Sequence, residues 1–410
     1  MTDIVLHRLH RFLWRATVLG AVCAFAWSST GVAAEGSDDG SVQPFQPETF
    51  TVDQAIDPGP VVLVNQASWD GASRIHIYSQ DGLAYQGLLS MGLTSQLIVS
   101  RDQTRVYTLS DYMERYTYGP IHSVVQAFDL ATLKPVAEVE VPNKAAKAIG
   151  MEHLIEISAD ERYLYVQNAT PGTSVTVVDL DDMTVLKEVP TPGCYGVYPS
   201  VEGHRFSTLC GPGTLNVYDV DDDDPGATPS EPFFSVEDDA LYLHSVRTND
   251  GHLVFTSFNG NLYILDDSGD RPALVKKLAV TEDIDGDWAP GGYGITAYNA
   301  ATDKLFMIVH SDAYEGSHKD MSEEIWTYSI TDEKLVSRSG APHLVALAVS
   351  RGDQPVLFGS NEEDESVDKY TLADGDAGQF EFEKTASDAR VGWTTSLMTA
   401  ASPTQSASAE

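Results

Sequence analysis

The sequence predicts an all-β fold, a seven-bladed β-propeller built from four-stranded antiparallel blades. Seven apolar runs each end in Asp, Ser or Thr, and a second strand-like run follows each of them a few residues later. They close at Ser79, Asp129, Asp179, Asp219, Asp266, Ser329 and Thr371, so that successive closing residues are 50, 50, 40, 47, 63 and 42 positions apart. Repeats of about 40–45 residues are typical of one four-stranded propeller blade.

A second set of apolar runs completes the predicted blades. Turn residues introduce strand-like runs that begin at Tyr163, Leu253, Leu305 and Val356. Each is typical of a hairpin followed by a strand that is buried on a blade. No linker divides the chain and few stretches show a helical apolar stripe, so we expect one propeller domain over residues 61–400. Residues 61–64 and 391–395 would share a blade and close the ring.

The two ends of the chain are expected to lie outside the propeller. Three arginines precede a short apolar stretch, and small residues up to Ala34 precede Glu35, which indicates a cleaved signal peptide over residues 1–34. The alternative is a retained anchor, although the stretch is short for a membrane span. Residues 35–60 are rich in Gly, Ser, Asp and Pro and predict a flexible acidic arm, and residues 401–410 predict a disordered tail. Export points to a periplasmic protein.

The charge of the chain restricts its partners. The sequence contains 25 Lys and Arg residues against 61 Asp and Glu residues, a formal net charge of −36. Such a charge disfavours nucleic acid and acidic membrane surfaces as partners, and it would attract a cationic ligand or a basic protein surface. Adaptation to a salty habitat explains the same composition. The acidic run at residues 221–224 is expected to be a solvated loop.

Two cysteines remain once the signal peptide is removed. Cys194 and Cys210 form an even pair in an oxidising compartment, which favours a disulfide over the alternative of two buried free thiols. The closed loop is short, so a disulfide would stabilise the fold by about 3 kcal/mol in the chain-entropy model.

Motifs for catalysis are missing from the chain. It has no Gly-x-Ser-x-Gly and no His-Glu-x-x-His sequence, and neither mature cysteine has the surroundings of an activated thiolate. His153, His244 and His318 fall in different repeats, and a structural role is expected for each. We therefore expect no catalytic, cofactor-binding or metal-binding residue in this chain. The residues alone predict an exported acidic propeller that binds a partner.

Segments between the repeated runs resemble a known family. They are Glu114-Arg115 with Gly119, Val166-Gln-Asn-Ala-Thr-Pro171, Gly193-Cys194-Tyr195 with Cys210-Gly211, Phe234-Ser-Val-Glu-Asp-Asp239, Trp288-Ala-Pro-Gly-Gly-Tyr293, and Glu315-Gly-Ser-His-Lys319 with Glu324-Ile-Trp326. In order and approximate spacing they resemble the large (heavy) subunit of the tryptophan tryptophylquinone-dependent amine dehydrogenases. The likeness covers about residues 61–400. The second and last segments resemble aromatic amine dehydrogenase more closely than methylamine dehydrogenase.

The resemblance implies that this chain is one subunit of an enzyme. In the family the large subunit is a seven-bladed propeller in a periplasmic heterotetramer of two large and two small subunits. The tryptophan tryptophylquinone cofactor forms on the cysteine-rich small subunit, so none is expected on this chain. The enzyme would deaminate a primary amine oxidatively to an aldehyde and ammonia. Electrons would pass to a type I copper protein of the azurin or amicyanin kind.

The resemblance also assigns roles to three residues. Leu93 falls where a large-subunit loop borders the substrate channel, at a position that is usually Phe, and a plain packing role is the alternative. Cys194 and Cys210 match the disulfide within one blade of the family. The substrate is expected to be an arylalkyl amine. The other readings are a methylamine dehydrogenase large subunit and a non-enzymatic exported propeller that binds a ligand or protein.

Overall fold

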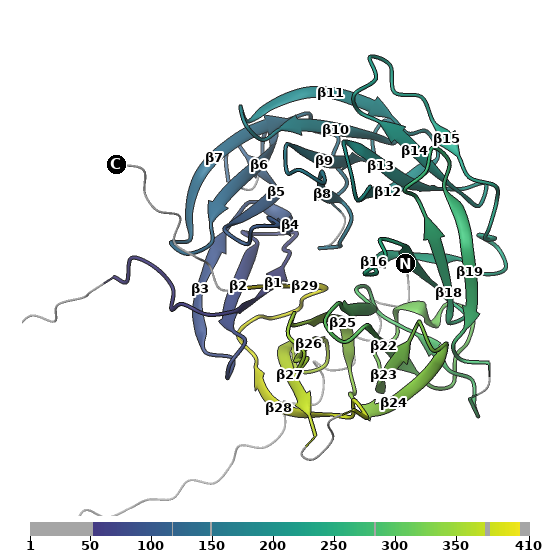
Figure 1. Cartoon of the computed structure of the whole chain (residues 1–410). Helices are drawn as coiled ribbons and strands as arrows, with labels where there is room; N and C mark the ends of the chain where they lie inside the picture. The colour runs from purple at the N-terminus through teal and green to yellow at the C-terminus, as the bar shows by residue number, and fades with distance from the viewer. Residues whose placement is uncertain (1–51, 117, 148–149, 283, 374–377, 402–410) are drawn as a thin grey trace, which may run out of the picture. The chain divides into compact units, whose positions relative to one another are not determined.

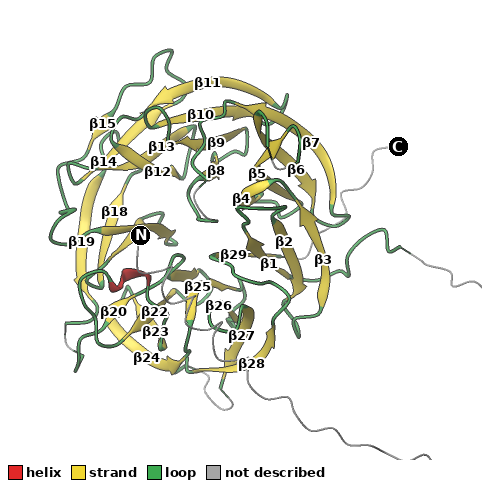
Figure 2. Cartoon of the chain, turned by 180° about the vertical axis from the view of Figure 1, so that it is seen from behind, coloured by secondary structure: helices red, strands yellow, loops and turns green. Residues whose placement is uncertain are grey.

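The strands of this chain form seven antiparallel sheets around a central axis, as the blades of a propeller (Figure 1). The computed structural model describes residues 52–116, 118–147, 150–282, 284–373 and 378–401. Seen from behind, these residues are almost all strand and loop, with one short helical turn (Figure 2). The predicted fold class is therefore confirmed. The predicted signal peptide, most of the arm and nearly all of the tail lie outside the described residues.

We number the blades along the chain from the one that contains the first strand. The strands of each blade are given from the axis outward. Blade 1 has β29 (Ser396–Ala400), β1 (Val61–Gln66), β2 (Arg74–Ser79) and β3 (Tyr85–Ser90). Blade 2 has β4 (Leu93–Val99), β5 (Arg105–Met113), β6 (Ile121–Asp129) and β7 (Lys134–Val141). Blade 3 has β8 (Ile155–Ile157), β9 (Tyr163–Asn168), β10 (Ser174–Asp179) and β11 (Thr184–Pro190).

The remaining four blades follow the same pattern. Blade 4 has β12 (Cys194–Pro199), β13 (Arg205–Cys210), β14 (Thr214–Asp219) and β15 (Thr228–Pro229). Blade 5 has β16 (Leu241–Arg247), β17 (Leu253–Ser257), β18 (Asn261–Asp266) and β19 (Ala273–Ala279). Blade 6 has β20 (Ala289–Pro290), β21 (Thr296–Asn299), β22 (Lys304–His310), the 3-10 turn η1 (Ser317–Lys319), β23 (Glu324–Ser329) and β24 (Lys334–Gly340). Blade 7 has β25 (Leu344–Val349), β26 (Leu357–Asn361), β27 (Ser366–Leu372) and β28 (Phe382–Asp388).

The repeated runs of the sequence occupy one position in every blade. All seven form the strand that is third from the axis: β2, β6, β10, β14, β18, β23 and β27. The four runs that were predicted to follow turns lie in the strands immediately before, β9, β17, β22 and β26. In blade 6 the innermost strand is divided into β20 and β21, which both pair with β22. The repeat period in the sequence is therefore the spacing between the third strands of successive blades, each of which ends in a tight turn.

The core of the molecule lies between the blades. Seven clusters of buried apolar side chains each draw on neighbouring blades. Because side chains alternate along a strand, Val61 and Leu63 pack toward blade 2, whereas Val62 and Val64 pack toward blade 7. Burial of each such side chain contributes about 1.5–3 kcal/mol. Continuous apolar runs are therefore required here, because both faces of the inner strands are covered.

The ring closes within blade 1, where the first described strand meets the last. β1 pairs with β29 in antiparallel register, with Val61 opposite Ala400. The predicted blade is correct, but the predicted partner at residues 391–395 is wrong, since the strand begins at Ser396. Gly392 has a φ of +65°, which is incompatible with an extended strand, so this segment turns before the strand starts.

The described end of the N-terminal arm contacts the propeller without forming a strand. The backbone amide of Ile56 donates to the carbonyl oxygen of Ala131 at 2.8 Å. The Ile56 side chain packs against the cluster between blades 1 and 2. The described residues include no helix long and apolar enough to cross a bilayer.

Neighbouring blades are also joined by polar groups. The ring of His204 lies between two carboxylates, with Nε2 3.0 Å from Asp160 and Nδ1 2.7 Å from Asp221. Burial lowers the pKa of His204, but the hydrogen bonds to the two aspartates outweigh burial and raise it overall. One blade further on, Arg247 makes a two-pronged contact with the fully buried carboxylate of Asp267, at 2.8 and 3.0 Å. The His204 contacts join blade 4 to blade 3, and Arg247 joins blade 5 to blade 4 by donating to the carbonyl oxygen of Pro199 at 2.6 Å.

Candidate functional site

One face of the propeller carries the segments that the sequence singled out. In each blade the innermost strand begins where the second strand ends, as the pairs Leu93–Asp111, Cys194–Cys210 and Leu241–Ser257 show. The loops that enter the innermost strands therefore lie beside the loops that leave the second strands. We call this side of the ring the loop face.

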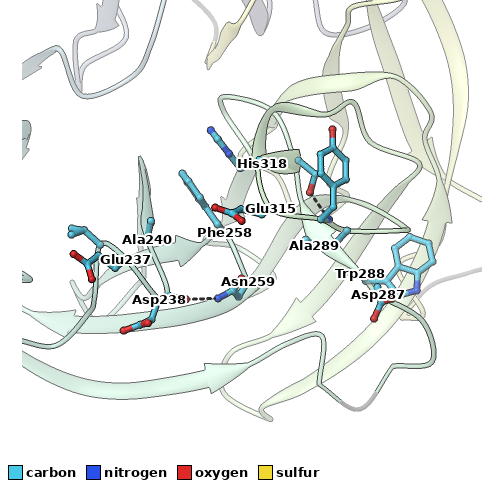
Figure 3. A pocket seen from close by; sticks show the side chains of 15 residues that line it. Glu237, Asp238, Ala240, Phe258, Asn259, Asp287, Trp288, Ala289, Glu315 and His318 are labelled. Carbon is cyan, nitrogen blue, oxygen red and sulfur yellow. Dashed lines mark hydrogen bonds between the residues drawn. The ribbon is translucent and has the colours of Figure 1, made fainter.

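A pocket of about 680 Å³ opens on the loop face between blades 5 and 6. Four segments line it: the loop before β16, the turn after β17, the start of β20 and the loop after β22 (Figure 3). Three of them contain family-like sequences, at residues 234–239, 288–293 and 315–319. Residues separated by about 80 positions in the chain are thus brought together, because the ring places the loops of adjacent blades side by side.

Stacked aromatic rings form one wall of the pocket. Phe258 and His318 lie with ring centroids 4.1 Å apart and planes within 4° of parallel. Tyr242 meets Phe258 edge-on at 4.7 Å. The Tyr242 hydroxyl lies 2.7 Å from the carbonyl oxygen of Pro290 and 2.8 Å from that of His318. The buried Tyr242 hydroxyl therefore links this aromatic wall to two of the segments that line the pocket.

The Arg338 side chain packs against Trp288 at the other side of the pocket. The guanidinium of Arg338 lies 4.6 Å from the centroid of the Trp288 ring and 5.2 Å from that of Trp326. Glu324 orients this guanidinium by a two-pronged contact at 2.7 and 3.0 Å. The Trp288 indole donates to the carbonyl oxygen of Asp285 at 3.1 Å. Such a cation–π contact contributes about 0.5–1 kcal/mol at an exposed site.

The two glycines after Pro290 permit a close backbone approach. A Cβ on Gly291 would lie 2.3 Å from the carbonyl oxygen of Asp320, and a Cβ on Gly292 would lie 2.4 Å from that of Val345. Gly292 also has a φ of +118°. This approach divides the innermost strand of blade 6 and turns Tyr293 toward blade 7, where its amide donates to Val345 at 2.6 Å.

The pocket is acidic at its rim. Four exposed carboxylates, those of Glu237, Asp238, Asp287 and Glu315, are among the described residues that line it, and no Lys or Arg is. Burial lowers the pKa of His318, and the nearby Lys319 lowers it further, so its ring stays neutral near pH 7. A pocket with aromatic walls and a carboxylate rim attracts organic cations and basic protein side chains.

The structure places the predicted site residues on the same face but in other blades. Leu93 begins β4 in blade 2, is half-buried, and does not line the pocket between blades 5 and 6. The disulfide between Cys194 and Cys210 is present and joins the first two strands of blade 4. The pairing that the resemblance implied is confirmed, whereas the channel role of Leu93 stays a prediction.

Sequence reasoning missed one cluster of titratable side chains. His153 and His244, which were expected to play separate structural roles, lie with ring centroids 5.8 Å apart. Glu152 joins them, with a carboxylate oxygen 3.4 Å from Nδ1 of His244. The sequence shows little sign of this cluster, because the two histidines are separated by 91 positions. Only closure of the propeller brings these parts of blades 3 and 5 together.

Comparison with known proteins assigns the chain to a family. The sequence model of the methylamine dehydrogenase heavy chain (MADH) family matches residues 61–387, nearly the whole propeller. The chain belongs to the methylamine dehydrogenase heavy chain family.

Relatives in this family are distant but span most of the chain. The methylamine dehydrogenase heavy chain of Paracoccus versutus is 25% identical over 296 residues, which cover 71% of this chain and 68% of that protein. The heavy chain of Methylophilus methylotrophus is 23% identical and covers 73% and 75%. That of Methylorubrum extorquens is 23% identical and covers 86% and 87%. These relatives confirm the large-subunit resemblance, and the closer likeness to aromatic amine dehydrogenase stays a prediction.

Solved structures with other functions share the propeller. A putative 6-phosphogluconolactonase from Bacteroides uniformis superposes with a TM-score of 0.59 at 13% identity, covering 84% of this chain and 100% of that one. Another from Bacteroides fragilis gives a TM-score of 0.57 at 13% identity, covering 84% and 98%. At such identities the likeness concerns the fold alone.

Proposed function

We propose that this chain is the large subunit of a periplasmic amine dehydrogenase that deaminates primary arylalkyl amines oxidatively. The products are an aldehyde and ammonia, and the electrons pass to a type I copper protein. The observation that carries the proposal is the convergence of three family-like segments on one loop-face pocket, in a chain whose propeller matches the family over residues 61–387.

The partner in this proposal is a small, cysteine-rich subunit that docks on the loop face. Val236 and Tyr314 expose more than half of their surface at the pocket, beside four carboxylates. Exposed apolar and aromatic side chains within a polar rim are typical of protein interfaces. Two large and two small subunits would assemble. The quinone on the small subunit would supply the group that accepts electrons from the amine.

The role of this chain is to scaffold the small subunit and wall the amine entrance. The acidic rim raises the local concentration of protonated amines, which are cations at neutral pH. Leu93, half-buried at the start of β4, would form part of the channel wall where the family usually has Phe. A branched aliphatic side chain there leaves room for a substrate ring that a Phe side chain would fill. This supports an arylalkyl amine as substrate.

Co-expression with the gene for the small subunit tests the assembly. We expect the two chains to co-purify from the periplasm, with quinone absorbance that tyramine or phenylethylamine bleaches. A complex without a chromophore, or one that no primary amine bleaches, would refute the proposal. A stable monomer that fails to bind the small subunit would favour the non-enzymatic propeller.

The relatives named above make methylamine the second candidate substrate, and a substitution separates the two. Leu93→Phe should lower the ratio of kcat/KM for tyramine to that for methylamine by about 10-fold, since hydrophobic pocket changes alter specificity by about 1–3 kcal/mol. Leu88→Phe on the outer strand of blade 1, at a side chain that is 37% exposed, is the matched control and should leave the ratio unchanged. Higher turnover of methylamine than of tyramine in the wild type would identify a methylamine dehydrogenase.

A further inference from the structure

We propose that a divalent transition-metal ion binds near the propeller axis, held by Glu152, His153 and His244. Each of these residues offers one ligand atom, and all three atoms lie within 4.8 Å of one another. Two imidazole nitrogens and a carboxylate oxygen are a donor set that suits Zn²⁺ and its first-row neighbours. The site goes beyond the proposed function and does not depend on it.

The three side chains come from blades that are not neighbours. Glu152 and His153 lie in the loop that enters β8 in blade 3, and His244 lies within β16 in blade 5. Blade 4 separates the two in the ring (Figure 1). The innermost strands converge at the axis, so a short loop of blade 3 reaches the inner strand of blade 5. An ion at this point would join two blades across the axis.

The hydrogen bonds of His244 leave one ring nitrogen ready to bind a cation. Its Nε2 lies 2.7 Å from the carbonyl oxygen of Thr296, which can only accept, so Nε2 carries the hydrogen. The lone pair is then on Nδ1, which has no hydrogen-bond partner among the described residues, although the side chain is 96% buried. A metal-binding histidine typically donates its other N–H to a backbone carbonyl in this way.

His153 and the carboxylates complete the donor set. Nε2 of His153 lies 3.0 Å from the Ser245 carbonyl oxygen and 3.2 Å from the Ser245 amide nitrogen, so either ring nitrogen can carry the hydrogen. In the tautomer with the hydrogen on Nε2, Nδ1 has a lone pair for an ion. This Nδ1 lies 2.8 Å from the carboxylate of Glu156, which could provide a further oxygen to the same ion. Among the described residues, Glu152 and Glu156 form ion pairs only with histidines. Two largely buried carboxylates without a Lys or Arg partner are costly, and a divalent cation would neutralise them.

The distances fit an ion after a small adjustment. In a tetrahedral zinc site with bonds of about 2.0–2.2 Å, neighbouring ligand atoms are about 3.3–3.6 Å apart. The Glu152 oxygen and Nδ1 of His244 already lie 3.4 Å apart. All three ligand atoms lie within 4.8 Å of one another, so a shift of about 1 Å by one side chain would bring them to the spacing of a tetrahedral site.

A cavity along the axis gives the ion access and room for a water ligand. It has a volume of about 260 Å³ and is lined by Glu152, by His244 and by innermost strands of five blades. Arg351 also lines it, with a side chain that is exposed to solvent. Three protein ligands and a water in the fourth position would complete a tetrahedral site.

Zinc binding to the full-length exported chain tests the site. The chain is stripped with EDTA, and Zn²⁺ binding is measured by equilibrium dialysis with metal analysis, together with the visible absorbance of Co²⁺. We expect one Zn²⁺ per chain and a rise in Tm with the ion, because the ion binds the folded state. Glu152→Gln, which keeps the size of the side chain, should weaken binding by more than about 10-fold, the lower end of the loss for an outer-shell partner.

A surface histidine provides the matched control. His122 contacts Glu140 at 2.9 Å with both side chains exposed, so His122→Gln should leave the affinity and the stoichiometry unchanged. Absence of one-equivalent binding, equal binding by Glu152→Gln, or loss of the ion in His122→Gln would overturn the assignment. His244→Gln should abolish the Co²⁺ absorbance. If this variant does not fold, Glu152→Gln decides, provided its Tm in EDTA equals that of the wild type.

Discussion

Replacement of Tyr242 by Phe should loosen the loop-face pocket while the propeller stays folded. The Tyr242 side chain is buried, and its hydroxyl lies within 2.8 Å of the carbonyl oxygens of Pro290 and His318. Phe keeps the edge-on contact with Phe258, whose ring centroid is 4.7 Å away. The substitution therefore removes one oxygen and leaves the packing of the ring in place.

The magnitude follows from the groups that lose a partner. The His318 carbonyl oxygen still accepts from the amide of Gly292 at 3.1 Å, so the larger loss falls on Pro290. A net hydrogen bond contributes about 1 kcal/mol, and a buried carbonyl left without a partner costs about 1–3 kcal/mol. We expect the free energy of local opening to fall by about 1–2 kcal/mol, which corresponds to a factor of about 5–30 in the open population.

Hydrogen exchange measured by mass spectrometry is the appropriate assay, because it resolves local opening. Amides in residues 291–293 and 317–320 should exchange about 5–30-fold faster in Tyr242→Phe than in the wild type. Tyr112→Phe is the matched control, since its hydroxyl bonds Gln126 at 2.7 Å in a partly exposed position in blade 2. Unchanged exchange at the pocket, or equal acceleration by the control, would refute the reasoning.

Three further predictions concern the ion pairs and the disulfide that join strands and blades. Arg247→Met should lower the free energy of unfolding by about 3–5 kcal/mol, because it leaves the buried carboxylate of Asp267 unpaired. Urea unfolding should show partial recovery of this loss when Asp267→Asn is added, and a loss below about 1 kcal/mol in Arg247→Met would contradict the expectation. The pKa of His204 is raised in the folded state, so its stabilising contribution is complete below the unfolded pKa of about 6.5 and is lost as pH rises through the folded pKa. Urea midpoints between pH 5 and 9 should reveal this decline, and His204→Gln should remove it; an identical decline in the variant would exclude His204 as the cause. Joint replacement of Cys194 and Cys210 by Ser should cost about 3 kcal/mol in the same assay, and an unchanged midpoint would show that the disulfide contributes nothing.

The propeller could be predicted because its signal is local. Each blade repeats a strand with a polar end, such as Val175–Asp179 or Leu262–Asp266, and the period between them survives differences in loop length. The closing strand was misplaced by a few residues because Val391 is as apolar as a strand residue. Its burial in the cluster between blades 7 and 1 does not require an extended backbone. Apolar content indicates burial, whereas the φ of Gly392 decides where the strand begins.

The pocket could be predicted only in pieces. The segments at residues 234–239, 288–293 and 315–319 stood out as family-like, but nothing in their spacing indicated that they meet. They converge because loops of adjacent blades lie side by side on one face of the ring. Leu93 lies on the same face but three blades away from the pocket. Its position relative to the pocket depends on how many blades separate them in the closed ring.

By itself the sequence determined the repeat, the seven blades, the pairing of Cys194 with Cys210 and the likeness to an amine dehydrogenase large subunit, because these depend on patterns along the chain. Only the tertiary structure decided which loops form the pocket and that Glu152, His153 and His244 meet near the axis. The physical reason is ring closure. A closed ring of blades makes neighbours of residues whose separation in sequence carries no information about their distance in space.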